Sequence, residues 1–191
     1  MNHLANAASL LIDIFFGLAA VLFVLRLALQ WVGAPFHNPL CQAIYRMSNP
    51  VLMPLRRVLK PWRKIDLAAA LVAYLVMCGK AALMLAIWSI PLGMAAIALL
   101  GLAELLGLVI TLWFWLILIV VILSWVGRGA SHPAIPLLTR LTEPVLAPFR
   151  RLLPKPGGID LSPMLVVLLL LLARILIVAP LQELALGFSQ A

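Results

Sequence analysis

The sequence predicts an all-α membrane protein with four transmembrane helices. These helices form two parallel tandem repeats, each with an amphipathic interfacial helix in its cytoplasmic loop. Hydrophobic residues make up 65% of the 191 positions and charged residues only 10%, whereas a soluble domain typically carries about a quarter charged residues. Two further observations support this fold class: the cations gather between particular apolar runs, and one loop motif occurs twice.

Apolar segments of the required length occur four times along the chain. A hydrocarbon core of ~30 Å needs roughly 20 helical residues to cross it, which a soluble fold would have no reason to supply repeatedly. The expected spans lie at about 8–31, 67–90, 105–126 and 163–186. We expect a kink in the last span near Pro180, since proline cannot donate the helical hydrogen bond.

The third apolar stretch is too long to be one span. Residues 92–126 would measure ~52 Å as a single helix at 1.5 Å per residue. Pro91 marks a break before the stretch, and Glu104 divides it. We therefore expect residues 92–104 to form an outer connection, either on the membrane surface or partly re-entrant.

The distribution of the lysines and arginines predicts the orientation. Most of the fourteen cations fall in two loops, 34–66 and 127–162, and the segment between the second and third spans has none. Loops rich in lysine and arginine stay in the cytoplasm. With four spans, both basic loops then lie on the cytoplasmic side and both termini lie outside.

An internal duplication covers most of the chain at an offset of 94 residues. NPVLMPLRRVLKPWRKIDL at 49–67 matches EPVLAPFRRLLPKPGGIDL at 143–161 without a gap. The repeats are expected at 1–91 and 105–191. Because each repeat crosses the membrane twice, both have the same orientation, unlike the inverted repeats common in secondary transporters.

The repeated loop resembles that of the YggT family of bacterial and plastid membrane proteins. The similarity rests on NPLCQAIYRMSNPVLMPLRRVLK in the first copy and LTRLTEPVLAPFRRLLPKPGGIDLSP in the second. The first copy has Arg63 and Lys64 in place of the two glycines. The resemblance implies a multi-pass protein of the bacterial inner membrane. It associates the family with osmotic-stress tolerance, with cell division or nucleoid organisation and, in a plastid branch, with haem attachment to a cytochrome, but provides no catalytic residues.

Each copy of the motif predicts an amphipathic helix. Pro50 and Pro144 suit the first turn of a helix, capped by Ser48 or Asn49 in the first copy and by Thr142 in the second. Apolar residues then share one helical face, and cations border or oppose it, as in helices that lie in a membrane interface. The expected lipid-binding or partner-binding residues are Arg56, Arg57, Lys60, Arg150, Arg151 and Lys155. Alternatively, these cations only fix the topology.

An aspartate stands at the start of the closing span of each repeat. Asp66 and Asp160 are expected to cap these helices, where a carboxylate also complements the helix dipole. Pairing with a motif arginine is a second structural role. A catalytic or metal-binding role is the least favoured interpretation.

Three cations lie within the predicted spans. Arg26 is near the cytoplasmic end of its span and is expected to extend toward that interface. Lys80 and Arg174 occupy equivalent positions in the two repeats, about 20 Å past the aspartates at 1.5 Å per residue. Because a charge inside a span usually has a partner, Asp13 and Glu104 are the candidate counter-ions. The alternative role for these charges is an ion or proton pathway.

Motifs for catalysis and cofactor binding are missing from the sequence. The three histidines and two cysteines lack metal-ligand spacing, and the chain has no GxSxG, HExxH or Walker motif. We expect no cofactor, no metal and no enzymatic activity. Although the net charge is +8, the cations belong to membrane-flanking loops, and no direct contact with nucleic acid is expected.

Two classes of function remain open. The first is a non-enzymatic membrane-organising or assembly factor, whose basic loops bind anionic phospholipid of the cytoplasmic leaflet or a membrane, cell-division or assembly protein. The alternative is an ion channel or small-solute transporter linked to osmotic stress. Because four spans are few for a transport path, the alternative requires a homo-oligomer.

Overall fold

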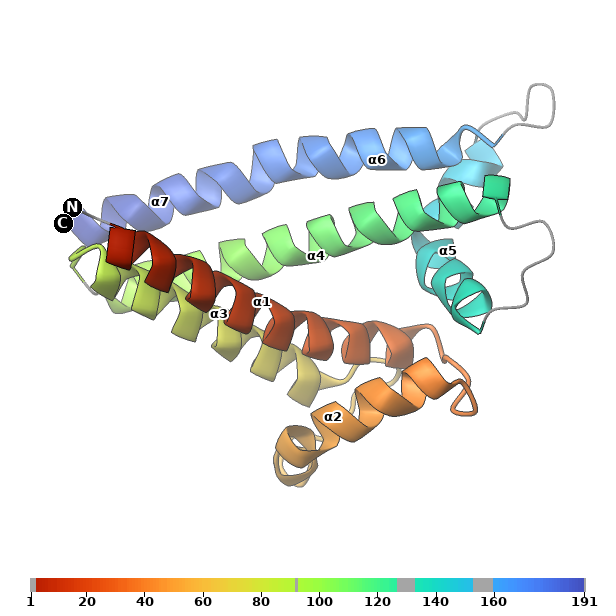
Figure 1. Ribbon diagram of the computed structural model, residues 1–191, viewed down its shortest axis with the longest axis horizontal. Helices are drawn as coiled ribbons and strands as arrows, with labels where there is room; N and C mark the ends of the chain where they lie inside the picture. Colours follow the sequence, from red (N-terminus) through yellow and green to blue (C-terminus); the bar gives the residue numbers. More distant parts are fainter. Residues whose placement is uncertain (1–2, 92, 127–132, 153–159, 191) are drawn as a thin grey trace.

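The computed structural model describes residues 3–91, 93–126, 133–152 and 160–190, and these residues form helices and no strand (Figure 1). Four helical stretches among them are long and apolar enough to cross a membrane. They are α1 (His3–Trp31), α3 (Leu67–Ile87), α4 (Met94–Val126) and a fourth made of α6 (Ser162–Ala173), η2 (Arg174–Val178) and α7 (Ala179–Gln190). The predicted all-α fold with four apolar spans is confirmed.

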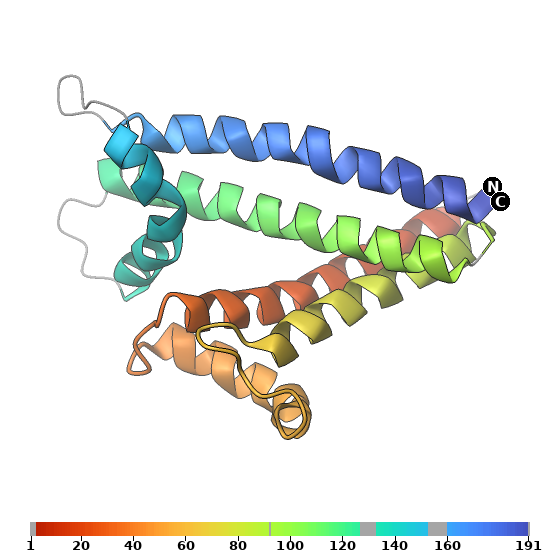
Figure 2. The ribbon, with the colours of Figure 1, turned by 180° about the vertical axis from the view of Figure 1, so that it is seen from behind.

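The two remaining helices follow the first and third spans. These are α2 (Pro39–Arg56) and α5 (Ala134–Leu152). Both chain termini lie at one end of the bundle, here called the terminal end, and α2 and α5 lie near the other, the loop end (Figure 1 and Figure 2). Since α1 and α4 both run from the terminal end to the loop end, the two repeats have the same orientation.

The repeats pack closely through α3 and α4 and are joined again at the loop end. Gly101 of α4 allows a close approach, because a Cβ atom there would lie 3.0 Å from Cα of Cys78 in α3. The helix pair α1 and α3 diverges from the pair formed by α4 and the fourth span toward the loop end (Figure 1). There, Leu137 and Leu141 of α5 belong to the same buried cluster as Leu29 of α1, so a helix of the second repeat contributes to the core of the first.

The third span differs from the expectation. The helix α4 begins at Met94 and continues without interruption to Val126, so the expected separate connection at 92–104 is wrong. Glu104 does not interrupt the helix because its carboxylate lies 2.7 Å from Nζ of Lys80, and a compensated charge can remain inside a span. At ~50 Å, α4 exceeds the hydrocarbon thickness and must tilt or extend beyond it.

The fourth span contains a π-helical segment at the place where a kink was expected. Within it, the backbone N–H of Ala179 donates to the carbonyl oxygen of Arg174, five residues earlier. The next residue, Pro180, has no N–H to donate to the preceding turn. Single π-helical turns within α-helices are frequent at functional sites, and this one begins at an arginine.

The helices of the loops begin earlier than the sequence suggested. Asn38 caps α2, its side-chain oxygen accepting from the N–H of Leu40 at 2.9 Å, and Pro39 occupies the first turn. Pro50 and Pro144 lie inside α2 and α5, so their expected place in the first turn is wrong. Both prolines are exposed, where water or lipid headgroups can satisfy the carbonyls that proline leaves unpaired.

The expected caps also have another role. Ser48 is buried within α2, and its hydroxyl donates to the carbonyl oxygen of Ile44 at 2.7 Å. Thr142 is buried within α5 and donates to the carbonyl oxygen of Leu138 at 3.0 Å. Both hydroxyls therefore donate hydrogen bonds to the preceding turn of their own helix. Neither residue caps the start of a helix.

Candidate functional site

Asp66 organises a buried cluster of charges at the loop end of the first repeat. It is the N-cap of α3, and its Oδ1 accepts from the N–H of Ala69 at 3.3 Å. Its Oδ2 accepts a hydrogen bond from Nη2 of Arg56, which also lies 3.3 Å from Oε1 of Gln30. The side chain of Asp66 is 0% exposed. A carboxylate in such a place requires cationic partners, which α1 and α2 supply.

Arg26 is the second cation of this cluster and does not extend to the surface as expected. Its side chain is 2% exposed, and its Nε lies 3.7 Å from Oδ2 of Asp66. Its guanidinium carbon lies 3.3 Å from the ring centroid of Tyr45 in α2, a cation–π distance. The carboxylate and the aromatic ring offset part of the cost of burying this charge, although Nε and Nη1 of Arg26 have no hydrogen-bond partner among the described residues. We call Arg26, Tyr45, Arg56 and Asp66 the loop-end cluster.

The second repeat has the equivalent pair in a more open setting. Nε of Arg150 donates to Oδ2 of Asp160 at 2.8 Å, and Nη1 of Arg150 donates to Oε2 of Glu143 at 2.6 Å. The N–H of Ser162 donates to Oδ1 of Asp160 at 3.0 Å. Asp160 thus satisfies the first turn of α6 although the N-cap itself is Leu161. The side chains of Arg150 and Asp160 are 30% and 32% exposed.

These bonds shift the ionisation of both partners. Partial burial acts to raise the pKa of Asp160, but the hydrogen bonds from Ser162 and Arg150 outweigh it and hold the pKa below its usual value. Burial acts to lower the pKa of Arg150, while the carboxylates of Asp160 and Glu143 raise it above its usual value. The pair is therefore charged at neutral pH.

The two arginines of each motif have different environments. The first, Arg56 or Arg150, is held by an aspartate of its own repeat and is only partly exposed, and its expected role in binding lipid or a partner stays a prediction. The second, Arg57 or Arg151, is exposed. Lys60 is also exposed, and Lys155 lies outside the described residues.

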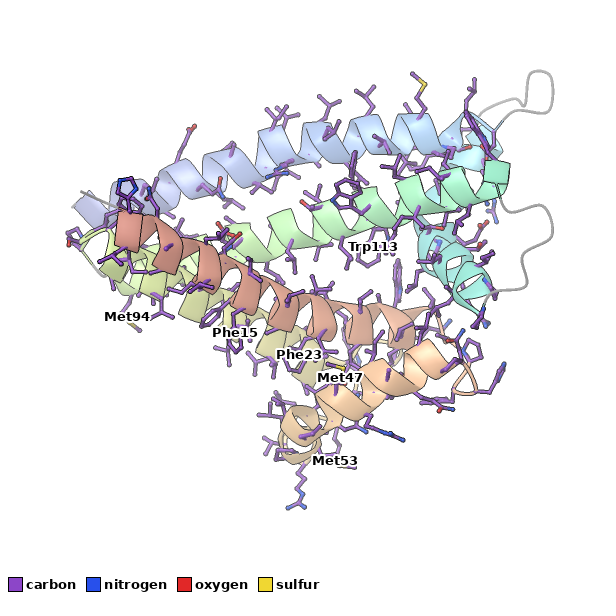
Figure 3. The ribbon with its side chains drawn as sticks, viewed as in Figure 1. Phe15, Phe23, Met47, Met53, Met94 and Trp113 are labelled. Carbon is purple, nitrogen blue, oxygen red and sulfur yellow. The ribbon has the colours of Figure 1, made fainter. Side chains whose placement is uncertain are left out.

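A basic face results at the loop end. We give this name to seven exposed cations: Arg46, Arg57, Lys60, Arg63, Lys64, Arg140 and Arg151. Sequence reasoning did not single out Arg46, Arg63, Lys64 and Arg140 as binding residues, although their place in the basic loops was a signal. Exposed apolar side chains also occur in this segment: Met47 and Met53 lie on α2 (Figure 3), Trp62 follows it, and each is at least 64% exposed.

Nearer the terminal end, Lys80 joins three spans. Its Nζ lies 2.6 Å from Oδ1 of Asp13 in α1 and 2.7 Å from Oε2 of Glu104 in α4. The structure thus brings Lys80 together with both counter-ions that the sequence analysis named. Because Glu104 belongs to the second repeat, this ion-pair network also bridges the two repeats.

A cavity of about 470 Å³ adjoins this network, and we call it the terminal cavity. Its volume lies in the range of small-molecule sites. Besides Asp13, Lys80 and Glu104, its polar lining includes Thr111, Arg174 and Gln182. Sequence reasoning missed Thr111 and Gln182. They could have been found, since they lie seven and eight residues after Glu104 and Arg174, which places them on the same helical faces.

Arg174 enters the cavity without an ion-pair partner in the described part of the chain. Both carboxylates expected as candidate partners go to Lys80, and Arg174 is exposed at the start of η2. The described residues contain no group of three or more histidine, cysteine, aspartate or glutamate side chains that could hold a metal. The charged side chains of the cavity lining are suited to binding a charged ligand.

Comparisons with known proteins agree with the duplicated architecture. The family model described as CCB3/YggT matches residues 5–87 and again 99–181. The chain is 38% identical over 170 residues to the protein named YggT of Escherichia coli, covering 89% of this chain and 86% of the relative. It is 37% identical over 192 residues to a protein of Pseudomonas aeruginosa, covering 93% and 91% of the two chains. No solved structure matches the chain.

Proposed function

The chain belongs to the CCB3/YggT family, and we propose that it is a non-enzymatic membrane-organising or accessory factor whose basic face binds anionic phospholipid. In this proposal the loop end lies at the cytoplasmic leaflet of the bacterial inner membrane and both termini lie outside. The proposed orientation follows the tendency of lysine and arginine to stay in the cytoplasm.

One observation supports this proposal above all others. The acidic side chains described at the loop end, Asp66, Glu143 and Asp160, are all engaged by arginines of the bundle. The seven cations of the basic face are therefore not compensated by these acids. Each cation near an anionic leaflet contributes ~1 kcal/mol to binding. The exposed apolar side chains on α2 suit the region between headgroups and acyl chains.

Lipid preference of the purified protein tests this proposal. Native mass spectrometry measures the ratio of phosphatidylglycerol to phosphatidylcholine that remains bound. The variant Arg57→Gln, Lys60→Gln, Arg151→Gln should reduce this ratio by on the order of a hundredfold if three contributions of ~1 kcal/mol add. Glu183→Gln is the control, because it changes one exposed charge on α7, away from the basic face. An unchanged ratio in the triple variant would refute the proposal.

A second candidate function rests on the terminal cavity. A polar cavity bounded by charges within the spans is also what a channel or small-solute transporter needs. In this case Lys80→Met should abolish flux through proteoliposomes, while the triple variant of the basic face should keep it. A wild-type protein that carries no flux of common ions or small solutes would exclude this function.

A further inference from the structure

The terminal cavity combines two kinds of unused charge. Oδ1 of Asp13 and Oε2 of Glu104 contact Lys80, and neither carboxylate pairs with another cation among the described residues. The guanidinium of Arg174 carries a positive charge and has no carboxylate partner among the described residues. The cavity therefore presents both hydrogen-bond acceptors with negative charge and donors with positive charge.

An unpaired guanidinium within a span calls for a counter-ion. A charge inside the bilayer is costly, and such residues almost always pair or face a polar interior. The protein itself leaves Arg174 at the cavity wall with Thr111 and Gln182, which are uncharged. An oxyanion that accepts two parallel N–H bonds from guanidinium is the strongest partner of this kind.

A simple anion would not suit the rest of the lining. Lys80 is shared by two carboxylates, so that group of three carries one negative charge in excess. This excess attracts a cation and repels an isolated anion. A ligand with both charges satisfies both parts of the lining, whereas a ligand with one charge satisfies only one of them.

We infer that the terminal cavity binds a zwitterion that carries an oxyanion and a protonated amine. The oxyanion pairs with Arg174, and the amine donates to the carboxylates of Asp13 and Glu104. The ethanolamine headgroup of a phospholipid has this chemistry, and so does the free headgroup, phosphoethanolamine. The inference concerns the terminal end and does not depend on lipid binding by the basic face.

Two arms of one experiment distinguish these sources. In the first arm, native mass spectrometry compares retention of phosphatidylethanolamine and phosphatidylcholine by the full chain. The trimethylated amine of phosphatidylcholine cannot donate hydrogen bonds to carboxylates, so wild type should prefer phosphatidylethanolamine. In the second arm, soluble phosphoethanolamine is added in detergent and the thermal unfolding midpoint is measured, since a bound ligand raises it.

Substitutions connect either signal to the cavity. Arg174→Gln should lower the retention of phosphatidylethanolamine, or the affinity for phosphoethanolamine, about tenfold, because the phosphate loses charge-assisted hydrogen bonds. Asp13→Asn should weaken discrimination between the two amines, while Glu104 still holds Lys80. The control Glu183→Gln changes an exposed charge of α7 that does not line the terminal cavity, and it should leave both signals unchanged.

Each result decides the inference. A signal in the lipid arm alone, lost in Arg174→Gln, supports it and assigns the ligand to a lipid headgroup. A signal in the soluble arm, lost in the same variant, supports it and assigns a free zwitterion. Because Arg174→Lys retains the positive charge, it checks that a lost signal does not reflect unfolding. No signal in either arm, or binding of phosphatidylethanolamine and of phosphoethanolamine that Arg174→Gln leaves unchanged, overturns the inference.

Discussion

Equivalent ion pairs at the loop ends of the two repeats lie in different surroundings. Arg56–Asp66 and Arg150–Asp160 are related by the duplication, and both fasten a loop helix to the start of a closing span. In the first repeat the aspartate side chain is 0% exposed and a second arginine, Arg26, lies beside it. In the second repeat the aspartate is 32% exposed. The same pair is therefore a core feature in one repeat and a surface feature in the other.

The cations inside the spans differ in a second way. Lys80 and Arg174 are also equivalent, but Lys80 has two carboxylate partners and Arg174 has none in the described residues. The positions equivalent to Asp13 and Glu104 are Gly107 and Leu10, so Arg174 lacks the two acids that an equivalent network would need. Both repeats therefore keep the arginine–aspartate pair at the loop end, here called the loop anchor. Within the spans, Lys80 is paired with carboxylates and Arg174 is not.

The largest expected effect comes from removing the aspartate of each loop anchor. Asp66→Asn leaves Arg26 buried without its anionic partner, and losing one member of a buried pair costs about 3–5 kcal/mol of unfolding free energy. Asp160→Asn should cost about 1 kcal/mol or less, because partly exposed pairs contribute little. Denaturant unfolding in detergent micelles measures both. Equal losses in the two variants would contradict the distinction between a core pair and a surface pair.

Substituting Lys80 and Arg174 in turn tests the difference between the paired and the unpaired cation within the spans. Lys80→Met leaves Asp13 and Glu104 unpaired within the bundle and should cost about 3 kcal/mol, the scale for an uncompensated charge in a span. Arg174→Met removes a cation that has no carboxylate partner and should be neutral or stabilising in the absence of ligand. Lys80→Arg, which keeps the charge, is the control. A larger loss for Arg174→Met than for Lys80→Met would contradict the observed pairing.

Much of this architecture follows from the sequence because it depends on composition and charge. The four spans reflect long apolar runs, and the matching loops reveal the parallel repeats. The partners of Lys80 could be named because a charge in a span needs a counter-ion, and Asp13 and Glu104 were the acids available at that end.

The features that the sequence did not predict depend on the surroundings of a residue in the fold, which patterns of neighbouring residues do not reveal. Pro50 suggested a helix start, but α2 continues through it because the proline faces outward. Glu104 suggested a helix end, but its pairing with Lys80 removes the reason to stop there. Arg26 suggested extension to the interface, but Asp66 and Tyr45 from other segments surround it. For Glu104 and Arg26 a distant partner offsets a cost that the local sequence predicts, and for Pro50 the exposed position does so.

A smaller effect is expected at the contact between the repeats. Gly101→Ala would place its Cβ atom 3.0 Å from backbone atoms of Cys78, which cannot move as a flexible side chain can. Overpacking of this kind costs about 1–3 kcal/mol. Gly17→Ala is the matched control within a span, because nothing lies within 4 Å of the added atom. Thermal unfolding in detergent should show a lower midpoint for the first variant only.

The smallest expected effect is the pH dependence of the surface anchor in the second repeat. Hydrogen bonds from Ser162 and Arg150 lower the pKa of Asp160, so its contribution is present above the unfolded pKa of about 4 and is lost as pH falls through the folded value. The stability difference between wild type and Asp160→Asn should therefore be constant from neutral pH to about pH 5 and shrink below about pH 4. Unfolding midpoints measured in one detergent across this range give that difference directly. A difference that grows on acidification would show that Asp160 is not held as a carboxylate by Arg150.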